Sequence, residues 1–258
     1  MTTETFLTTH SVFTRDELAA VLRARGRVKA TVASHLARWT RQGRIARVKQ
    51  GVFVRAGGAP DFVALASRMA PDAAVAYHTA LEVHGYAQSV FERLTYVTWT
   101  GAKPTTFEGR RFVPVRPRAP LRAADRGERW IERAERAGVE IRVTDLERTV
   151  VDVLDRPELA GGIEEVWRSL ASVPAVDPTS LDDYVNLLGG RTLAAKVGFF
   201  LESRREDLVV PAAILERLRA RIPRSPVFMD RRRKGRLVAR WALIVPQEVY
   251  AEPVGGHE

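Results

Sequence analysis

The sequence predicts an α+β protein in which an N-terminal winged helix-turn-helix is followed by a larger, helix-rich α+β domain. Three observations lead to this prediction: a length of 258 residues, a concentration of basic side chains near the N-terminus, and both helical and strand-like periodicities in the rest of the chain. A chain of this length can form two globular domains. We expect them at residues 1–57 and 61–258, because Ala56-Gly-Gly-Ala-Pro60 has the composition of a short linker.

The positive charge is concentrated in the first 55 residues. The whole chain has 41 Lys and Arg against 31 Asp and Glu, a formal net charge of +10. Residues 1–55 contain eleven basic and three acidic side chains, a net of +8, whereas residues 56–229 contain 24 of each. We therefore expect a polyanionic partner to be recognised by the N-terminal segment.

Composition also restricts the class of protein. The chain has no cysteine, so neither disulfides nor thiolate zinc sites can stabilise it. Its first residues lack the pattern of a secretory signal, and no apolar run approaches the ~20 residues of a membrane span. We expect a soluble, cytoplasmic protein.

Two helices are expected early in the chain. Thr14-Arg-Asp-Glu17 is a capping box, in which the hydroxyl and the carboxylate satisfy backbone N–H groups at the start of a helix that ends near Gly26. A second helix is predicted from Lys29 to Gln42, with a buried stripe formed by residues at helical spacing, namely Val32, Leu36 and Trp39.

The opposite face of the second helix has the side chains that a DNA recognition helix needs. Arginine can form paired hydrogen bonds with guanine, and hydroxyls can contact bases or phosphates. Residues 44–55 then read as two short strands around the turn signal Lys49-Gln50-Gly51, a wing along the phosphates. The predicted DNA-contacting residues are Lys29, Thr31, Ser34, His35, Arg38 and Arg41 on the helix and Arg44, Arg47 and Lys49 on the wing. A solvated charged surface or a protein-docking module are the alternatives.

The remainder of the chain alternates helical and strand-like segments. Strands are expected where β-branched and aromatic residues gather, and helices where apolar residues recur at helical spacing. The expected helices are residues 61–69, 73–84, 145–154, 163–170, 181–188, 192–202 and 212–221, and the expected strands are residues 94–100, 111–115, 139–143 and 237–245.

No catalytic or cofactor motif is found in this larger part. The P-loop, the nucleophile elbow and the dinucleotide-binding glycine pattern are all missing from the sequence. His78 and His84 are expected to be structural. Asp145, Glu147 and Asp152 resemble a nuclease carboxylate cluster, but a simpler interpretation explains the pattern better. In it, Asp145 or Thr144 caps a helix, and Glu147 and Arg148 are surface charges or a local ion pair. We expect no enzymatic activity, no metal and no cofactor.

A short basic run lies near the C-terminus. It is Arg231-Arg232-Arg233-Lys234, followed by Gly235. The run is either a second DNA contact or a solvated turn, because such a cluster adds affinity for phosphates only if it faces the same duplex.

Six motifs are spread over nearly the whole chain. They are Val12-Phe13-Thr14, Gly51-Val-Phe53, Ala76-Tyr-His-Thr-Ala-Leu-Glu-Val-His-Gly85, Val143-Thr-Asp-Leu-Glu-Arg-Thr-Val-Val-Asp152, Arg156-Pro-Glu-Leu-Ala-Gly-Gly162 and Ala195-Lys-Val-Gly-Phe-Phe-Leu-Glu202. Together they resemble AbiEi-type antitoxins and transcriptional regulators of type IV toxin–antitoxin systems. The resemblance implies a winged helix that represses its own operon at inverted repeats of double-stranded DNA. It also implies an antitoxin domain that counters a nucleotidyltransferase-like toxin without a stable complex.

Two other classes of protein fit the same sequence. One is a nuclease or nucleotide-modifying enzyme that uses the winged helix for targeting. The other is a stand-alone repressor whose larger domain binds a metabolite. Metal-dependent cleavage abolished by Asp145→Ala or Asp152→Ala would indicate the first, and thermal stabilisation by a small molecule would indicate the second.

Overall fold

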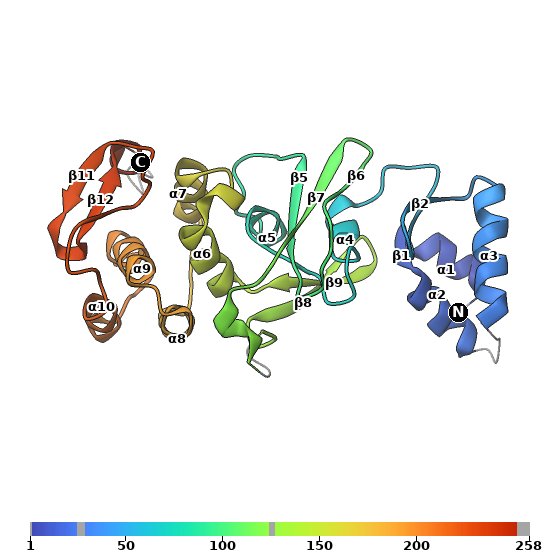
Figure 1. Ribbon diagram of the computed structural model, residues 1–258, viewed down its shortest axis with the longest axis horizontal. Helices are drawn as coiled ribbons and strands as arrows, with labels where there is room; N and C mark the ends of the chain where they lie inside the picture. Colours follow the sequence, from blue (N-terminus) through green and yellow to red (C-terminus); the bar gives the residue numbers. More distant parts are fainter. Residues whose placement is uncertain (1, 25–28, 124–126, 252–258) are drawn as a thin grey trace. The chain divides into compact units, whose positions relative to one another are not determined.

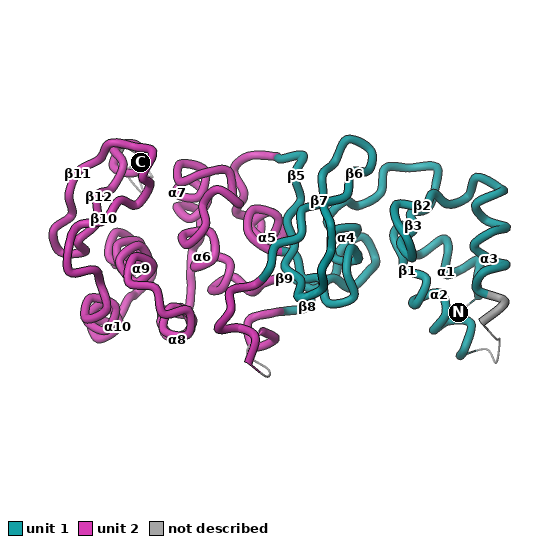
Figure 2. The backbone as a smooth tube through the Cα atoms, in the orientation of Figure 1, with its two compact units in different colours: residues 1–75, 91–116, 132–143 teal, residues 76–90, 117–131, 144–258 magenta. Residues whose placement is uncertain are grey.

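The computed structural model describes residues 2–24, 29–123 and 127–251, which contain eleven α-helices and three β-sheets. The predicted α+β class is therefore confirmed. The chain forms two compact units (Figure 2). Unit 1 comprises residues 1–75, 91–116 and 132–143, and unit 2 comprises residues 76–90, 117–131 and 144–258. Across the described residues, no helix combines the length and the apolar character that crossing a membrane requires.

Unit 1 begins with three helices and a three-stranded antiparallel sheet (Figure 1). The sheet has the strand order β1-β3-β2. The capping box at the start of α2 is present: the Glu17 N–H donates to the Thr14 hydroxyl at 3.1 Å, and the Thr14 N–H donates to the Glu17 carboxylate at 2.6 Å. The elements are α1 (Thr3–Thr9), β1 (Val12–Thr14), α2 (Arg15–Arg23), α3 (Lys29–Arg41), β2 (Ile45–Lys49) and β3 (Val52–Arg55).

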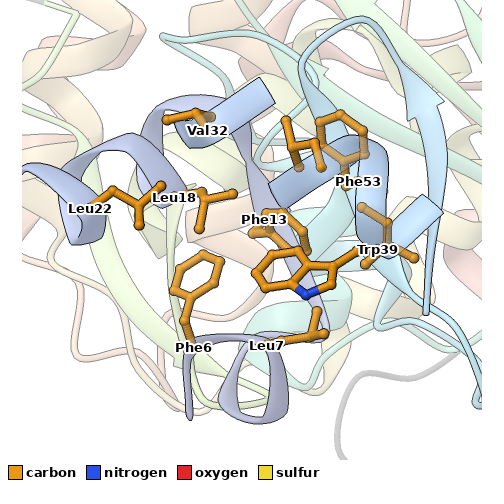
Figure 3. Close-up of a cluster of buried hydrophobic side chains, with 10 residues drawn as sticks. Phe6, Leu7, Phe13, Leu18, Leu22, Val32, Trp39 and Phe53 are labelled. Atoms are coloured by element: carbon orange, nitrogen blue, oxygen red, sulfur yellow. The ribbon is translucent and has the colours of Figure 1, made fainter. Parts of the chain in front are cut away.

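A single apolar cluster holds these elements together (Figure 3). The ring of Phe13 stacks on Phe53 at a centroid distance of 5.7 Å and meets Trp39 edge-on at 6.4 Å. The predicted stripe of α3 belongs to this cluster, as expected. Helix α1, which the sequence pattern did not predict, contributes Phe6 and Leu7, both almost fully buried.

A six-stranded mixed sheet completes unit 1, with the order β6-β7-β5-β4-β9-β8. Its central pairings are parallel between β5 and β7 and between β4 and β9, and antiparallel between β4 and β5. Three of these strands were predicted, and β4, β6 and β8 were not. The elements are α4 (Phe62–Ala66), β4 (Ala74–Val75), β5 (Arg93–Val97), β6 (Thr105–Phe107), β7 (Arg110–Val115), β8 (Ile131–Arg136) and β9 (Val139–Thr144).

The helix predicted over residues 73–84 is only half correct. Val75 lies in β4, a central strand of the six-stranded sheet, where it pairs with Tyr96 of β5 on one side and Val143 of β9 on the other. Tyr77 then takes a positive φ of 57°, and helix α5 (His78–His84) begins after it. The apolar residues before Tyr77 are buried because they lie in a central strand, and a short buried strand cannot be distinguished from a helix by apolar content alone.

Unit 2 is mostly helical. Its helices between residues 146 and 219 agree with the prediction to within a few residues, whereas the short helix at residues 247–251 was not predicted. Its helices, including α5 above, are followed by a small sheet of order β10-β12-β11. The further elements are α6 (Leu146–Asp155), α7 (Ile163–Ala171), α8 (Pro178–Leu188), α9 (Arg191–Ser203), α10 (Ala212–Arg219), β10 (Val227–Phe228), β11 (Gly235–Val238), β12 (Leu243–Pro246) and α11 (Gln247–Ala251).

The single strand predicted over residues 237–245 is wrong, because the segment folds back on itself. A 3₁₀ turn over Ala239–Trp241 and a left-handed residue, Ala242 with φ of 48°, separate β11 from β12, and the two strands pair antiparallel. Trp241 is fully buried, and its indole N–H donates to Glu202 at 2.6 Å. Its ring occupies the space beside Gly198 of α9, where any Cβ would overlap it.

Charged side chains are buried in the core of unit 2, contrary to the surface position expected for Arg148. Arg148 is 2% exposed, and its Nε donates to the carboxylate of Asp152 at 3.2 Å. The hydroxyl of Tyr184 donates to the other oxygen of that carboxylate at 2.9 Å. Of the two predicted caps, Asp145 and Thr144, it is Asp145 that caps α6, accepting from the Arg148 N–H at 2.8 Å. Side chains one turn apart on α6 therefore pair inward, where a surface pair was expected.

A second buried carboxylate, Glu165 of α7, holds the loop after α5. Its side chain accepts from the N–H groups of Gln88 at 3.2 Å and Ser89 at 2.9 Å, and from the Ser89 hydroxyl at 2.7 Å. The buried ring of His78 lies 3.5 Å away. The imidazole of the other predicted structural histidine, His84, is 2.8 Å from the carbonyl oxygen of Thr144.

Two buried cations satisfy backbone carbonyls at helix ends. Lys196 donates to the carbonyl of Leu154 at 2.9 Å, near the end of α6. Arg204 donates to carbonyls at and beyond the end of α7, where a helix leaves its last carbonyls unsatisfied. The three carbonyl oxygens belong to Leu170, Ala171 and Val173, and the Nε of Arg204 also donates to Asp207 at 2.8 Å.

Candidate nucleic-acid interface

The helix α3 presents a polar face opposite its buried stripe. Ser34, Arg38 and Arg41 are exposed on that face. The backbone of Lys29 and Thr31 lies in α3, but the side chains of both lie outside the described part of the structure. The described residues of the predicted helix surface thus include two arginines and a serine directed away from the core.

His35 does not belong to this exposed face. Its side chain is 9% exposed, and its ring lies 5.5 Å from the ring of Trp39. Side chains four positions apart are neighbours on a helix, so the imidazole lies next to Trp39 and extends the buried stripe. The ring Nδ1 is 3.1 Å from a guanidinium nitrogen of Arg38. The sequence-based placement of His35 on the outer face is therefore wrong.

The hairpin predicted over residues 44–55 is present as β2 and β3. Lys49 pairs with Val52 across a turn formed by Gln50 and Gly51, and Gly51 has the positive φ of 80° that such a turn requires. The register shifts between Arg47 and Lys49, which indicates a bulge on β2. Arg47 is exposed, and its Nε donates to the Lys49 carbonyl at 3.3 Å.

Arg44, a predicted phosphate contact, is held by an acidic residue that the sequence reasoning missed. Its two terminal nitrogens donate to the two carboxylate oxygens of Glu4 on α1, at 3.0 and 2.6 Å. The hydrogen bond from Arg44 lowers the pKa of Glu4 below its usual range. Nothing in the local pattern shows this pair, because the two residues are 40 positions apart and α1 itself was not expected.

Lys49, another predicted phosphate contact, also has a partner within unit 1. Its Nζ donates to the backbone carbonyl of Met69 at 2.7 Å. A phosphate that approached the hairpin would have to compete with that carbonyl. Arg38, Arg41 and Arg47 are therefore exposed cations, whereas Arg44 and Lys49 are half-buried, Arg44 against a carboxylate and Lys49 against a carbonyl.

The four basic side chains of the run near the C-terminus have different surroundings. Arg233 pairs with Glu164 and, at 2.7 Å, with Glu248. These carboxylates, together with Asp230 at 3.8 Å, surround its guanidinium with negative charge. The other three side chains of the run are exposed, namely Arg231, Arg232 and Lys234.

The carboxylates considered as a nuclease site do not come together. Asp145 caps α6, Glu147 accepts from the N–H of Asp177 at 2.8 Å, and Asp152 is buried against Arg148. Within the described ranges, no group of three His, Cys, Asp or Glu side chains is placed to hold a metal ion.

Comparison with known proteins identifies a solved structure with a similar fold. No family model matches this chain, and no curated protein does. The crystal structure of the RV2827C protein from Mycobacterium tuberculosis is similar to it, with a TM-score of 0.60, covering 94% of this chain and 89% of that one. The sequence identity is 15%, so the similarity concerns the fold alone.

Proposed function

We propose that the protein is a sequence-specific DNA-binding repressor and that its N-terminal segment acts as a winged helix-turn-helix. One observation carries the proposal. Residues 18–55 contain ten Lys and Arg and no Asp or Glu, and within this range α3 and the β2–β3 hairpin expose Arg38, Arg41 and Arg47. A segment without acidic residues that exposes several arginines favours a polyanion over an ordinary protein partner.

The proposal assigns different roles to the helix and the hairpin. Helix α3 would enter the major groove, where Arg38 and Arg41 can pair with guanine and Ser34 can bond a base or a phosphate. Arg47 would contact the DNA phosphates and fix the position of the protein on the duplex without reading the base sequence.

In this proposal, the ion pair between Glu4 and Arg44 limits how strongly the hairpin binds the DNA phosphates. While Glu4 holds both terminal nitrogens, Arg44 has little net charge to offer a phosphate. Removing the carboxylate by Glu4→Gln would release a cation beside the hairpin. Affinity for all duplexes should then rise, and the dependence on salt should become steeper by about one phosphate contact.

The biological role that we infer is that of an AbiEi-like antitoxin. This rests on the resemblance of motifs along the chain, such as residues 76–85 and 143–152. The protein would repress its own operon at inverted repeats, and its larger part would counter a nucleotidyltransferase-like toxin without forming a stable complex. Co-expression with a toxin of that class encoded beside the gene tests this role: continued growth supports it, and unrelieved toxicity rejects it.

DNA binding is tested with the purified full chain. Its affinity for the DNA upstream of its own gene is compared with that for scrambled duplex of equal length, over a salt series. Specific recognition predicts a preference of ~10³ or more, with affinity falling steeply as salt rises. Equal, weak binding to both duplexes would reject the repressor proposal.

Variants of α3 test the residue assignment. Arg38→Ala and Arg41→Ala should each cost about 1–3 kcal/mol on the specific duplex if they contact bases, and should narrow the preference over scrambled DNA. Arg205→Ala is the matched control, because Arg205 is an exposed arginine of unit 2. If the α3 variants bind like the control, the recognition helix has been wrongly assigned.

A further inference from the structure

The sheet of unit 2 has an open edge strand. Its order is β10-β12-β11, and among the strands in the described residues only β12 pairs with β11 (Figure 1). Gly235, Arg236 and Leu237 of β11 are all exposed. An edge strand of this kind offers backbone N–H and C=O groups to a further strand.

Apolar side chains form a row across the outer face of the same sheet. Phe228 of β10 is in register with Ile244 of β12, which is in register with Leu237 of β11. Residues paired across neighbouring strands share a face. Phe228 is 46% exposed and Leu237 is 49% exposed, whereas Leu243 and Val245, on the other face, are fully buried. The row therefore lies on the face that the core does not use.

Unpaired basic side chains lie next to this row. The segment between β10 and β11 contains exposed Arg231, Arg232 and Lys234, and β11 itself contains exposed Arg236. None of these four has an ion pair within the described part of the chain, whereas Arg233 is neutralised by Glu164 and Glu248. The open edge is thus both apolar and positively charged.

We propose that an extended, acidic segment of a partner protein adds to β11 as a fourth strand. Arg236 and Leu237 are consecutive on β11 and therefore point to opposite faces. A strand beside them would place apolar side chains next to Leu237 and acidic side chains next to Arg236, so the fitting sequence alternates the two kinds. Recognition by strand addition takes its affinity from backbone hydrogen bonds and its specificity from alternate side chains.

Two other occupants fit the edge less well. A second copy of this chain would bring Arg236 and the basic segment against like charges, which opposes pairing of the two edges. Duplex DNA could neutralise the cations but would leave Phe228 and Leu237 in water. The acidic strand satisfies both features of the edge.

The test uses a fluorescein-labelled peptide in which Glu alternates with Val. Its anisotropy is titrated with the full-length protein. One control peptide has Lys in place of Glu, and another has Ser in place of Val. We expect the Glu–Val peptide to bind at least about tenfold more tightly than either control, and added salt to weaken it. Equal affinity for the three peptides, or no binding of the Glu–Val peptide, would overturn the proposal.

Variants of the protein locate the binding to the edge. Leu237→Ser and Arg236→Ser should each weaken the Glu–Val peptide by about tenfold or more. Val90→Ser and Arg205→Ser are the matched controls, because Val90 is 87% exposed and Arg205 is an exposed arginine elsewhere in unit 2. If the edge variants bind the peptide like the controls, β11 is not the site.

Two further measurements distinguish the other occupants. Sedimentation of the full chain that shows a dimer dissociated by Leu237→Ser would assign the edge to a second copy and overturn the proposal. Loss of duplex DNA affinity on Arg231→Ser and Arg232→Ser, with no binding of the Glu–Val peptide, would assign it to DNA. The proposal is supported if these variants leave DNA affinity unchanged and weaken the peptide.

Discussion

The N-terminal segment and unit 2 are held together by different kinds of core. In the described part of the former, the buried side chains are apolar except for His35, which lies against Trp39. In unit 2, ionisable side chains such as Arg148, Asp152 and Glu165 are buried among the apolar ones. An apolar core is specified by pattern and volume, whereas a buried charge requires a particular partner at a particular distance. The two regions should therefore respond differently to substitution.

The largest expected effect is on the buried pair of unit 2. Asp152→Ala would leave Arg148 buried without its carboxylate and Tyr184 without its acceptor. The free energy of unfolding should fall by about 3–5 kcal/mol, measured by urea denaturation. The triple variant Arg148→Met, Asp152→Leu and Tyr184→Phe replaces all three side chains with apolar ones. It should lower the free energy of unfolding by less than Asp152→Ala alone. A triple variant that is less stable than the single one would contradict this account.

Glu165 tests the same idea through pH. Burial raises the pKa of Glu165, but hydrogen bonds from the Ser89 hydroxyl and N–H, together with the charges of His78 and Arg168, outweigh burial and leave the pKa below 4.5. The carboxylate therefore stabilises the fold above pH 4.5, and this contribution is lost as pH falls through the lowered value.

Replacing Glu165 should remove that dependence on pH. Glu165→Gln should lower the free energy of unfolding by about 2 kcal/mol at neutral pH, because hydrogen bonds to a charged acceptor are replaced by neutral ones. Urea denaturation at decreasing pH should show the difference from the original protein shrinking below pH 4.5. A difference that stays constant down to pH 3, roughly a unit below the ordinary value of a glutamate, would show that the charge plays no part.

Gly198 tests packing in unit 2 without changing any charge. In Gly198→Ala the new methyl group would overlap the indole of Trp241, and overpacking of this kind costs about 1–3 kcal/mol. Calorimetry should show a lower Tm for this variant. Gly190→Ala is a milder comparison, since its new Cβ would lie 3.2 Å from the Cβ of Leu193. Equal Tm values for the two variants would place the Trp241 ring elsewhere.

The smallest expected effect lies in the N-terminal segment, at the capping box. Thr14→Ala removes the oxygen that accepts from the Glu17 N–H, and loss of such a cap costs about 1 kcal/mol. Glu17→Gln should cost less, because a glutamine can still accept from the Thr14 N–H. Amide exchange in α2 measures both. If Glu17→Gln is the more damaging change, the ion pair between Glu17 and Arg68, at 3.1 Å, outweighs the cap.

The contrast between the two cores also explains how much the sequence could predict. Helices α2 and α3 and the β2–β3 hairpin were predicted closely, because their buried residues are apolar and their ends carry a capping box and a turn glycine. Arg148 was placed on the surface because a charged residue on a helix usually lies there. Its burial depends on Asp152 and Tyr184, and Tyr184 lies 32 positions from Asp152.

Other errors have different physical causes. The strand expected over residues 237–245 is interrupted at Ala242, because the burial of Trp241 beside Gly198 depends on a helix far away in the sequence. Within the candidate interface, the exposure of Arg38, Arg41 and Arg47 followed from helical and strand periodicity. The engagement of Lys49 by the Met69 carbonyl did not, because a contact with a backbone oxygen leaves no trace in the pattern of side chains.

The division of the chain into units determines the order in which they can be completed during synthesis. The chain passes from one unit to the other at residues 75/76, 90/91, 116/117, 131/132 and 143/144. Every segment of unit 1 is synthesised before residues 144–258, and at that point only residues 76–90 and 117–131 of unit 2 exist. The basic helix and hairpin can thus fold early, while the buried charges of unit 2 meet their partners last.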